Sequence, residues 1–254
     1  MKKAYLTLDP PREPDGTLCR TGLRRSAPVV LLPGDPQRSR KMAALFAEAS
    51  FTAHRGTFAT YTGKTPGGAD IAVTSSGMGC ACVAAALEEL AAAGAEAVIR
   101  VGTCGGVQPD LAPGTIIVIA SGCVRGEGAS YELVPPEFPA VADPLLVRAL
   151  CSAAQELDEP VRVGLYRSHD AFYMESKAAH PGLRERMQKW IDTGVLVVEN
   201  ESGLCFSPMA TCSACVPQAS ASRLVPCSQT RTPTSTGPMP TRSIWRAGSK
   251  LPRA

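Results

Sequence analysis

Residues 71–101 read IAVTSSGMGCACVAAALEELAAAGAEAVIRV, and their order of apolar and polar residues decides the fold. The first four, Ile71–Thr74, are apolar or β-branched, which predicts a buried strand that stops at the glycine-rich turn after it. Residues 81–93 carry apolar side chains at helical spacing and end at Gly94, which is typical of a helix C-terminus. Residues 97–101 are apolar again and predict a second strand. A strand, a helix and a strand in this order indicate an α/β domain.

The same alternation extends on both sides of this stretch. Apolar runs rich in β-branched residues predict further strands at residues 29–32, 115–120, 161–166 and 195–198, and helical periodicity predicts helices at residues 38–49 and 182–191. We therefore expect one α/β domain with a largely parallel or mixed central sheet flanked by helices.

The charge of the chain is unevenly distributed. Of 254 residues, 44% are apolar and 19% charged, with a formal net charge of +3, which is typical of a soluble globular protein. Residues 1–206 carry a net charge of −3, however, whereas residues 207–254 carry six basic residues and no acidic one. Of these last 48 residues, 21 are Ser, Thr or Pro, which predicts a disordered tail. A nucleic-acid-binding arm is the alternative, but the tail's charges are scattered singly and Trp245 is its only aromatic residue.

The sequence also indicates a compartment. No apolar run approaches the roughly 20 residues of a membrane span, and the start at Met1–Lys3 lacks the apolar region of a signal peptide. We expect a cytoplasmic protein that binds neither membrane nor nucleic acid, and we expect its ten cysteines to be free thiols. Four cysteines come nearest to a zinc-binding pattern: Cys205, Cys212, Cys215 and Cys227. Their spacing fits no standard zinc finger, so we expect no metal site.

Chemically distinctive residues follow the predicted strands, where α/β sheets bind their ligands. Glycine-rich turns with Arg38 and Arg100 predict a phosphate site, because glycine lets backbone N–H groups approach an anion and arginine offers a planar fork. The alternative is that the glycines form tight turns and the arginines are solvated. Neither turn is a Walker loop or a Gly-x-Gly-x-x-Gly, which argues against a dinucleotide-dependent dehydrogenase.

Several motifs follow one another in order along the chain: PGDPQR at residues 33–38, SGMG at 76–79, EEL at 88–90, RVGTCG at 100–105, EFPAVAD at 137–143, SHDAFY at 168–173 and ENES at 199–202. Together they resemble the nucleoside phosphorylase family, most closely its uridine phosphorylase branch. The resemblance covers residues 28–206, with an N-terminal extension at residues 1–27 and the tail at residues 207–254. It implies a three-layer fold with a mixed central β-sheet flanked by helices, and dimers that assemble into a hexamer.

The resemblance also implies a reaction and a phosphate site. A pyrimidine nucleoside of the uridine type and inorganic phosphate give free base and ribose 1-phosphate, as in nucleoside salvage, with phosphate as co-substrate and no metal or organic cofactor. The phosphate-binding residues implied are Gly34, Arg38, Arg100 and Thr103, with Arg55 from the neighbouring subunit. Positioning and electrostatics dominate such a step, so no nucleophilic side chain is required.

The implied ribose site is the ENES turn. Glu201 accepts hydrogen bonds from the ribose hydroxyls, Glu199 precedes it, and Asn200 stands where the family has Met; Arg100 and Glu201 are the expected catalytic residues. Two neighbouring carboxylates also fit a glycosidase acid/base pair or a solvated loop. Phe172 is expected near the base, although an aromatic after a strand is as often a core residue.

The sequence departs from the family at three places, the first of which leaves the base open. Residues 174–178 lack the Gln-x-Arg with which uridine phosphorylases read uracil, and Cys19 and Arg20 stand where the family places an aromatic residue and a histidine that close over the neighbour's nucleoside. Gly56 replaces a glutamate of the family's monovalent-cation site, so no ion is expected. A purine nucleoside phosphorylase of the same fold is therefore the alternative.

The tail is the largest departure. After Phe206 the family continues as an apolar helix, a core strand and a long helix, none of which the tail resembles. Reading the codons of residues 207–216 two nucleotides later permits GDLLGVRA, which fits the family's helix. The hypothesis is a frameshift, in the gene or its sequencing, that makes the chain a catalytically impaired remnant. Resequencing the locus tests it; an unchanged sequence with a folded tail contradicts it.

Overall fold

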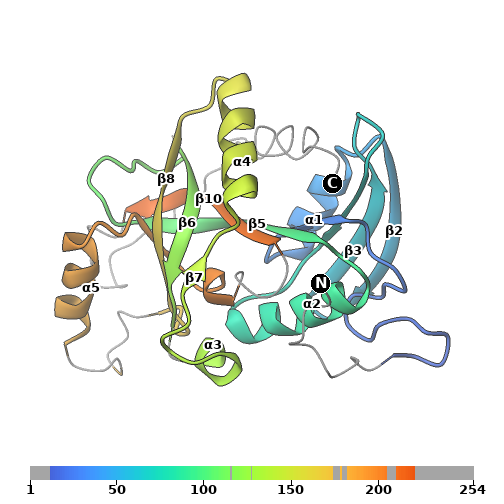
Figure 1. Ribbon diagram of the computed structural model, residues 1–254, viewed down its shortest axis with the longest axis horizontal. Helices are drawn as coiled ribbons and strands as arrows, with labels where there is room; N and C mark the ends of the chain where they lie inside the picture. Colours follow the sequence, from blue (N-terminus) through green and yellow to red (C-terminus); the bar gives the residue numbers. More distant parts are fainter. Residues whose placement is uncertain are drawn as a thin grey trace.

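Strands and helices alternate along the chain in the computed structural model, which describes residues 12–114, 116–126, 128–173, 178, 182–204 and 210–220 (Figure 1). The strands are β1 (Val29–Leu32), β2 (Glu48–Arg55), β3 (Phe58–Lys64), β4 (Asp70–Thr74), β5 (Ala97–Gly106), β6 (Ile117–Val124), β7 (Ala140–Val141), β8 (Val161–Ser168), β9 (Val197–Glu199) and β10 (Ala210–Ser220). The helices are α1 (Pro36–Ala43), α2 (Cys80–Ala92), α3 (Ala129–Leu133), α4 (Pro144–Glu156), α5 (Leu183–Asp192) and a short 3₁₀ turn, η1 (Ser202–Leu204).

The strands form one mixed sheet, as expected from the sequence. Its order is β10-β6-β8-β9-β5-β1-β4-β3-β2, with β7 beside β6. The central pairs β1–β4, β1–β5, β6–β8 and β8–β9 are parallel, whereas β2–β3, β3–β4 and β5–β9 are antiparallel. Because β10 pairs with both β5 and β6, the strands β5, β9, β8, β6 and β10 form a closed ring.

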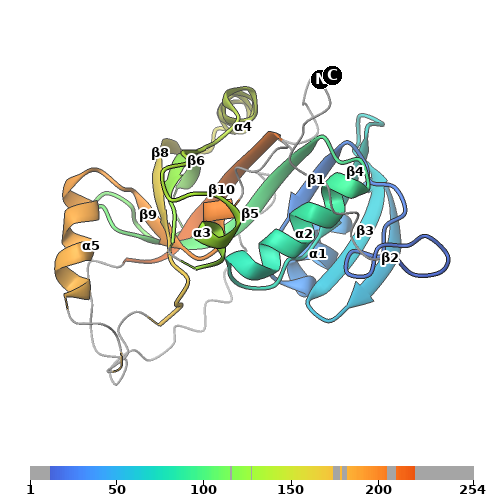
Figure 2. The same ribbon diagram turned by 60° about the horizontal axis from the view of Figure 1, so that its bottom comes forward.

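Helices cover both faces of the sheet. Successive residues of β1 point to opposite faces, as the two-residue period of a strand requires. Leu31 packs with Met42 of α1 and Leu150 of α4, whereas Leu32 packs with Leu90 of α2 in a second cluster. Figure 1 shows α4 and α2 on either side of β5 and β10, and Figures 1 and 2 place α5 and the β2–β3 hairpin at opposite ends. The predicted three-layer arrangement is confirmed.

Two local differences from the sequence-based expectation concern the first helix and the β2–β3 hairpin. The helix expected over residues 38–49 ends at Ala43, and residue 48 begins β2. Its start is well defined, because Pro36 stands in the first turn and the carboxylate of Asp35 accepts the N–H of Gln37 at 3.0 Å. The hairpin was not predicted because β2 is exposed on both faces and lacks a clear two-residue alternation.

Residues 210–220 differ from the expected disordered tail. The structure gives strand β10 there, parallel to β5 and antiparallel to β6 over a short stretch. Pairing with two neighbouring strands supplies backbone hydrogen bonds that the composition of the segment does not reveal. The other residues of the 207–254 tail lie outside the described part of the chain.

One disulfide corrects the expectation of free thiols. Cys104 of β5 is bonded to Cys215 of β10, with their Cα atoms 6.0 Å apart. The two residues are 111 positions apart in sequence, and their neighbourhood follows from the β5–β10 pairing, which the sequence did not predict. Among the cysteines whose side chains the structure describes, the free thiols are Cys19, Cys80, Cys82, Cys123 and Cys151.

The described helices are too short or too polar for a membrane span, so none of them qualifies as a candidate transmembrane segment.

Candidate functional site

The turns after β1 and β4 lie against each other at the carboxyl ends of these two parallel strands. The N–H of Gly77 donates to the carbonyl of Gly34 at 3.0 Å, and the N–H of Ser76 donates to that of Pro33 at 2.9 Å. A Cβ added to Gly34 would lie 3.1 Å from the Gly77 carbonyl oxygen, so the close approach of the two turns favours glycine. The two turns predicted from their glycines therefore form one surface next to β5.

Arg100 of β5 lies beside these turns, opposite Leu32 at the end of β1. Its side chain is buried, with 6% of its area exposed, and its guanidinium forms ion pairs with two carboxylates. Nη2 pairs with Oε2 of Glu201, and Nε lies 3.6 Å from Oε2 of Glu199. The structure therefore brings together Arg100, predicted for phosphate, and Glu199 and Glu201, predicted for ribose.

Arg38 adds a second positive charge. It extends from α1 toward β5, where its Nη1 donates to the carbonyl of Val101 at 3.4 Å. Burial and the nearby charge of Arg100 lower the pKa of Arg38 below its ordinary value. Two guanidiniums repel each other in this partly buried site, and a dianion bound between them would offset the repulsion.

The two carboxylates are held by backbone N–H groups. Oε2 of Glu199 accepts the N–H groups of Glu201 and Ser202, each at 2.8 Å, and Oε1 of Glu201 accepts the N–H of Gly79 at 2.9 Å. Burial is the main cause that raises the pKa of Glu199, and the charge of Glu201 acts in the same direction. Glu199 thus shapes the turn, while Glu201 lies between Arg100 and the start of α2.

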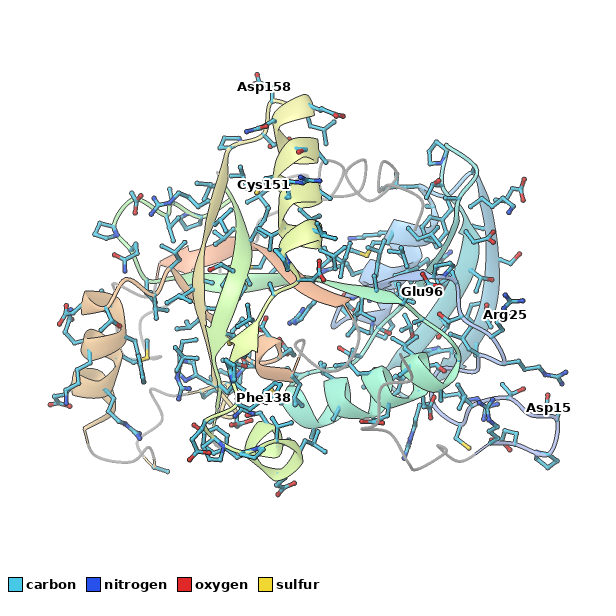
Figure 3. The ribbon with its side chains drawn as sticks, in the orientation of Figure 1. Asp15, Arg25, Glu96, Phe138, Cys151 and Asp158 are labelled. Atoms are coloured by element: carbon cyan, nitrogen blue, oxygen red, sulfur yellow. A yellow bond between two sulfur atoms is a disulfide. The ribbon has the colours of Figure 1, made fainter. Side chains whose placement is uncertain are left out.

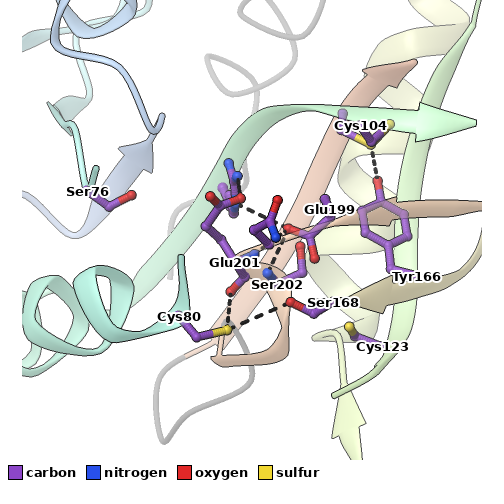
Figure 4. A network of polar contacts seen from close by, with 12 residues as sticks. Ser76, Cys80, Cys104, Cys123, Tyr166, Ser168, Glu199, Glu201 and Ser202 are labelled. Carbon is purple, nitrogen blue, oxygen red and sulfur yellow. Dashed lines mark hydrogen bonds and ion pairs between the residues drawn. A yellow bond between two sulfur atoms is a disulfide. The ribbon is translucent and has the colours of Figure 1, made fainter. Parts of the chain in front are cut away.

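Gly79, Cys80 and Ser168 belong to this site, although the sequence did not single them out individually. Gly79 has a φ of +87°, a conformation that favours glycine and that precedes the first turn of α2. The Cys80 sulfur lies 3.8 Å from the Ser168 hydroxyl and 3.8 Å from the Glu201 carbonyl oxygen (Figure 4). Burial raises the pKa of Cys80 to about 12, so it packs as a neutral thiol. Their signal in the sequence is their position in the glycine turn and at the end of β8.

The other predicted residues lie around this centre. Thr103 is half-buried on β5, and its backbone pairs with Val216 of β10. The amide nitrogen of Asn200 donates to the carbonyl of His169 at 2.7 Å, so in this structure it connects two loops. Phe172 is 59% exposed and contacts Tyr173 edge-to-face, so it is not a core residue.

Arg55 lies apart from Arg38 and Arg100 as an exposed residue at the end of β2. Its Nη1 pairs with Oε1 of Glu13 at 2.7 Å. Its role at the site of a neighbouring subunit stays a prediction. The stretch expected to read the base falls mostly outside the described residues, because residues 174–177 are not among them.

His169 connects the ends of β8 and β9 as a neutral imidazole. The backbone N–H of His169 donates to the Glu199 carbonyl at 2.8 Å. Burial, with the charges of Arg167 and Arg186, lowers the pKa of His169 from 6.5 to about 3. As the pH falls, the imidazole of His169 therefore takes up a proton at a higher pH in the unfolded chain than in the folded chain. The stability that follows is fully present above pH 6.5 and is lost as the pH falls from 6.5 toward 3.

We expect replacement of His169 by asparagine to flatten this pH dependence. The wild-type free energy of unfolding falls by about 2 kcal/mol between pH 7 and pH 5 through this group alone, as linkage predicts. Urea unfolding of both proteins at the two pH values measures it. The matched control is His54→Asn, at an exposed position of β2, which keeps the wild-type dependence. Equal pH dependence of the His169 variant and the wild type would show that His169 is not responsible.

Known proteins resemble most of this chain. A family profile described as the phosphorylase superfamily matches residues 28–213. A uridine phosphorylase of Treponema pallidum is 40% identical over 184 residues, which cover 70% of this chain and 69% of that protein. A uridine phosphorylase of Thermococcus kodakarensis is 40% identical over 187 residues, 72% of this chain and 65% of its own length. A guanosine phosphorylase of Halorubrum lacusprofundi is 34% identical over 179 residues, 70% of each.

Proposed function

This chain belongs to the phosphorylase superfamily, as its motifs predicted, and from that membership we propose that it cleaves a pyrimidine nucleoside of the uridine type by phosphorolysis. The observation that carries the proposal is the buried contact of Arg100 with Glu201. It joins a cation suited to phosphate and a carboxylate suited to sugar hydroxyls at one point of the site.

In the proposed reaction the phosphate lies between Arg38 and Arg100. The Gly34 turn and Thr103 supply further donors, and Arg55 of the partner subunit completes the set. A bound dianion stabilises both guanidiniums, which otherwise lower each other's preference for the charged state. Phosphate is a co-substrate here, and the proposal includes no metal or organic cofactor.

Glu201 holds the ribose beside this phosphate. A phosphate oxygen attacks C1′ while the bond from C1′ to the base nitrogen breaks, and its electron pair leaves with the base, which then takes up a proton. Positive charge develops on the sugar during this step, and the nearby phosphate and the Glu201 carboxylate stabilise it. Glu199 fixes the turn that carries Glu201 through the two N–H groups it accepts.

The identity of the base is the finer part of the proposal. Two of the relatives described above are uridine phosphorylases and one is a guanosine phosphorylase. Phe172, exposed in the loop after β8, is proposed to contact the base. Because the aligned regions span about two thirds of each relative, a purine nucleoside is the second candidate substrate.

The assembly and the location of the protein are also proposed. We propose cytoplasmic dimers that associate as a hexamer, in which Arg55 and the segment with Cys19 and Arg20 reach the site of the neighbouring subunit. The side chains of Arg55 and Arg20 are both exposed.

Incubation with uridine, thymidine, inosine and adenosine, each with and without inorganic phosphate, tests the function. We expect release of uracil and ribose 1-phosphate from uridine only when phosphate is present. Faster release of hypoxanthine from inosine would replace the pyrimidine by the purine assignment. No release from any nucleoside by the folded protein would contradict the proposed activity and favour the impaired remnant.

A further inference from the structure

Glu89 of α2 is a buried carboxylate outside the site described above. It is 3% exposed, and it accepts four hydrogen bonds from residues almost 70 positions earlier in the sequence. The N–H of Arg20 donates to both oxygens at 2.9 and 3.0 Å, and Thr21 donates its N–H at 2.7 Å and its hydroxyl at 3.0 Å. The three donor groups are two backbone N–H groups and one hydroxyl, so the carboxylate binds mainly a stretch of backbone and no cationic side chain.

The segment that Glu89 holds is otherwise attached at its ends. Leu18 and Leu23 are fully buried in the cluster beneath α2, so apolar packing fixes both sides of the loop. Between them, Cys19 is half-buried and Arg20 is exposed. The turn is closed by its own backbone, since the N–H of Leu18 donates to the Leu23 carbonyl at 2.9 Å and that of Gly22 to the Leu18 carbonyl at 3.1 Å. The four hydrogen bonds of Glu89 attach this closed turn to α2 at Arg20 and Thr21, and burial of the exposed Arg20 side chain adds nothing to that attachment.

The same segment lies against the end of β2. Gly22 has a φ of +69°, and a Cβ added to it would lie 2.2 Å from the Cβ of Ala53, two positions before Arg55. Earlier in the segment, Glu13 pairs with Arg55 at 2.7 Å. Asp15, in the same turn, lies at the outer edge of the molecule (Figure 3). The held segment and Arg55 thus form one exposed face.

We propose that Glu89 is a positioning residue, which acts through the backbone of Arg20 and Thr21 to hold the exposed segment in the geometry required by the nucleoside site of a second copy. This inference rests on the proposed phosphorolysis and on its dimer. Glu89 itself touches no substrate. Its effect is carried by the segment, so it acts on binding of the nucleoside and leaves the phosphate-binding arginines of its own chain unchanged.

Replacement of Glu89 by glutamine tests the inference, because glutamine keeps the length of the side chain and loses the charge and one acceptor. We expect KM for the nucleoside to rise about tenfold, which corresponds to roughly 1.4 kcal/mol, with KM for phosphate and kcat within twofold of wild type. Thr21→Val removes only the hydroxyl donor and shifts KM for the nucleoside in the same direction, by a smaller factor. The matched control is Glu88→Gln on the same helix, which leaves both KM values unchanged.

Mixed oligomers show whether the segment acts on the neighbouring subunit. Chains with Glu89→Gln are assembled with chains that carry Glu201→Ala, whose own site is inactive but whose segment is intact. We expect the remaining active sites that face an intact segment to recover the wild-type KM for the nucleoside. Recovery of none of them would overturn the action across the dimer.

The outcomes separate this inference from the proposed function. If the wild-type chain performs no phosphorolysis, the proposed function and the inference both fail. If the wild type is active and Glu89→Gln and Thr21→Val both keep the wild-type KM for the nucleoside, only the inference is overturned. A lower melting temperature with unchanged KM values would assign Glu89 a structural role alone and would also overturn it.

Discussion

Replacement of Arg100 by alanine is expected to lower kcat/KM for phosphorolysis by about 10³-fold, because a preorganised charge at the reacting centre is lost. The same change leaves Glu199 and Glu201 buried without their main cation. Breaking a buried ion pair by removing one partner costs about 3 to 5 kcal/mol, so the free energy of unfolding falls by a similar amount. Steady-state kinetics and urea unfolding measure the two effects.

Arg100→Lys separates the two effects. Lysine keeps a positive charge near the carboxylates but lacks the planar fork that pairs with phosphate and carboxylate together. We expect the free energy of unfolding of Arg100→Lys to lie closer to the wild-type value than that of Arg100→Ala. We expect its kcat/KM to stay at least about tenfold below wild type, which corresponds to a loss of about 1.4 kcal/mol of interaction with the phosphate. Arg148→Ala, at an exposed position of α4, is the control and leaves both quantities unchanged. Wild-type activity in Arg100→Ala would contradict the placement of Arg100 at the reacting centre.

Replacement of Glu201 by glutamine is expected to lower kcat/KM for the nucleoside by about 100-fold, because hydrogen bonds to charged groups contribute up to about 3 kcal/mol. Glutamine retains an oxygen for the Gly79 N–H, and Arg100 retains Glu199, so the fold is preserved. The loss therefore appears mainly in kcat and in KM for the nucleoside. KM for phosphate changes by a smaller factor.

The control for Glu201→Gln is Glu96→Gln, an exposed glutamate before β5, which keeps wild-type kinetics. Product analysis of Glu201→Gln also tests the glycosidase interpretation. Release of ribose without phosphate by the wild type, lost in Glu201→Gln, would indicate hydrolysis by the Glu199–Glu201 pair. Unchanged kinetics for the nucleoside would show that Glu201 does not bind the ribose.

The central strands were predictable because helices cover both faces of the sheet there, so that nearly every side chain of these strands is apolar and buried. β1 was predicted at its observed bounds and β4 within one residue, since each is a short apolar run that ends at a glycine turn. The β2–β3 hairpin was not, because exposed residues such as Phe51 give β2 no pattern that distinguishes it from a helix or a loop. Its place follows from pairing with β4, which is a tertiary contact.

The end of the described chain shows the opposite case. Ser, Thr and Pro in the tail predicted disorder, but residues 210–220 pair with β5 and β6 and complete the ring of strands. The disulfide between Cys104 and Cys215 depends on that pairing and was equally hidden from the sequence. Backbone pairing and a long-range bond leave little trace in local composition, which explains both corrections.

The site was predictable to the extent that its groups lie in loops after strands. The turns of Gly34 and Gly77 do meet, and Arg38, Arg100 and Glu201 do converge. The direct ion pair of Arg100 with Glu201 was not predicted, because it depends on how closely β5 and the turn after β9 approach. The role of Glu89 was also hidden, since its partners are backbone groups of a distant segment.

Incubation of the wild-type protein with uridine and inorganic phosphate, followed by ³¹P NMR, tests the central claim most directly. The account predicts that ribose 1-phosphate appears in the same amount as free uracil, and that neither forms when phosphate is omitted. Release of uracil without phosphate, with unphosphorylated ribose as the other product, would contradict it, as would no release of base by the folded chain.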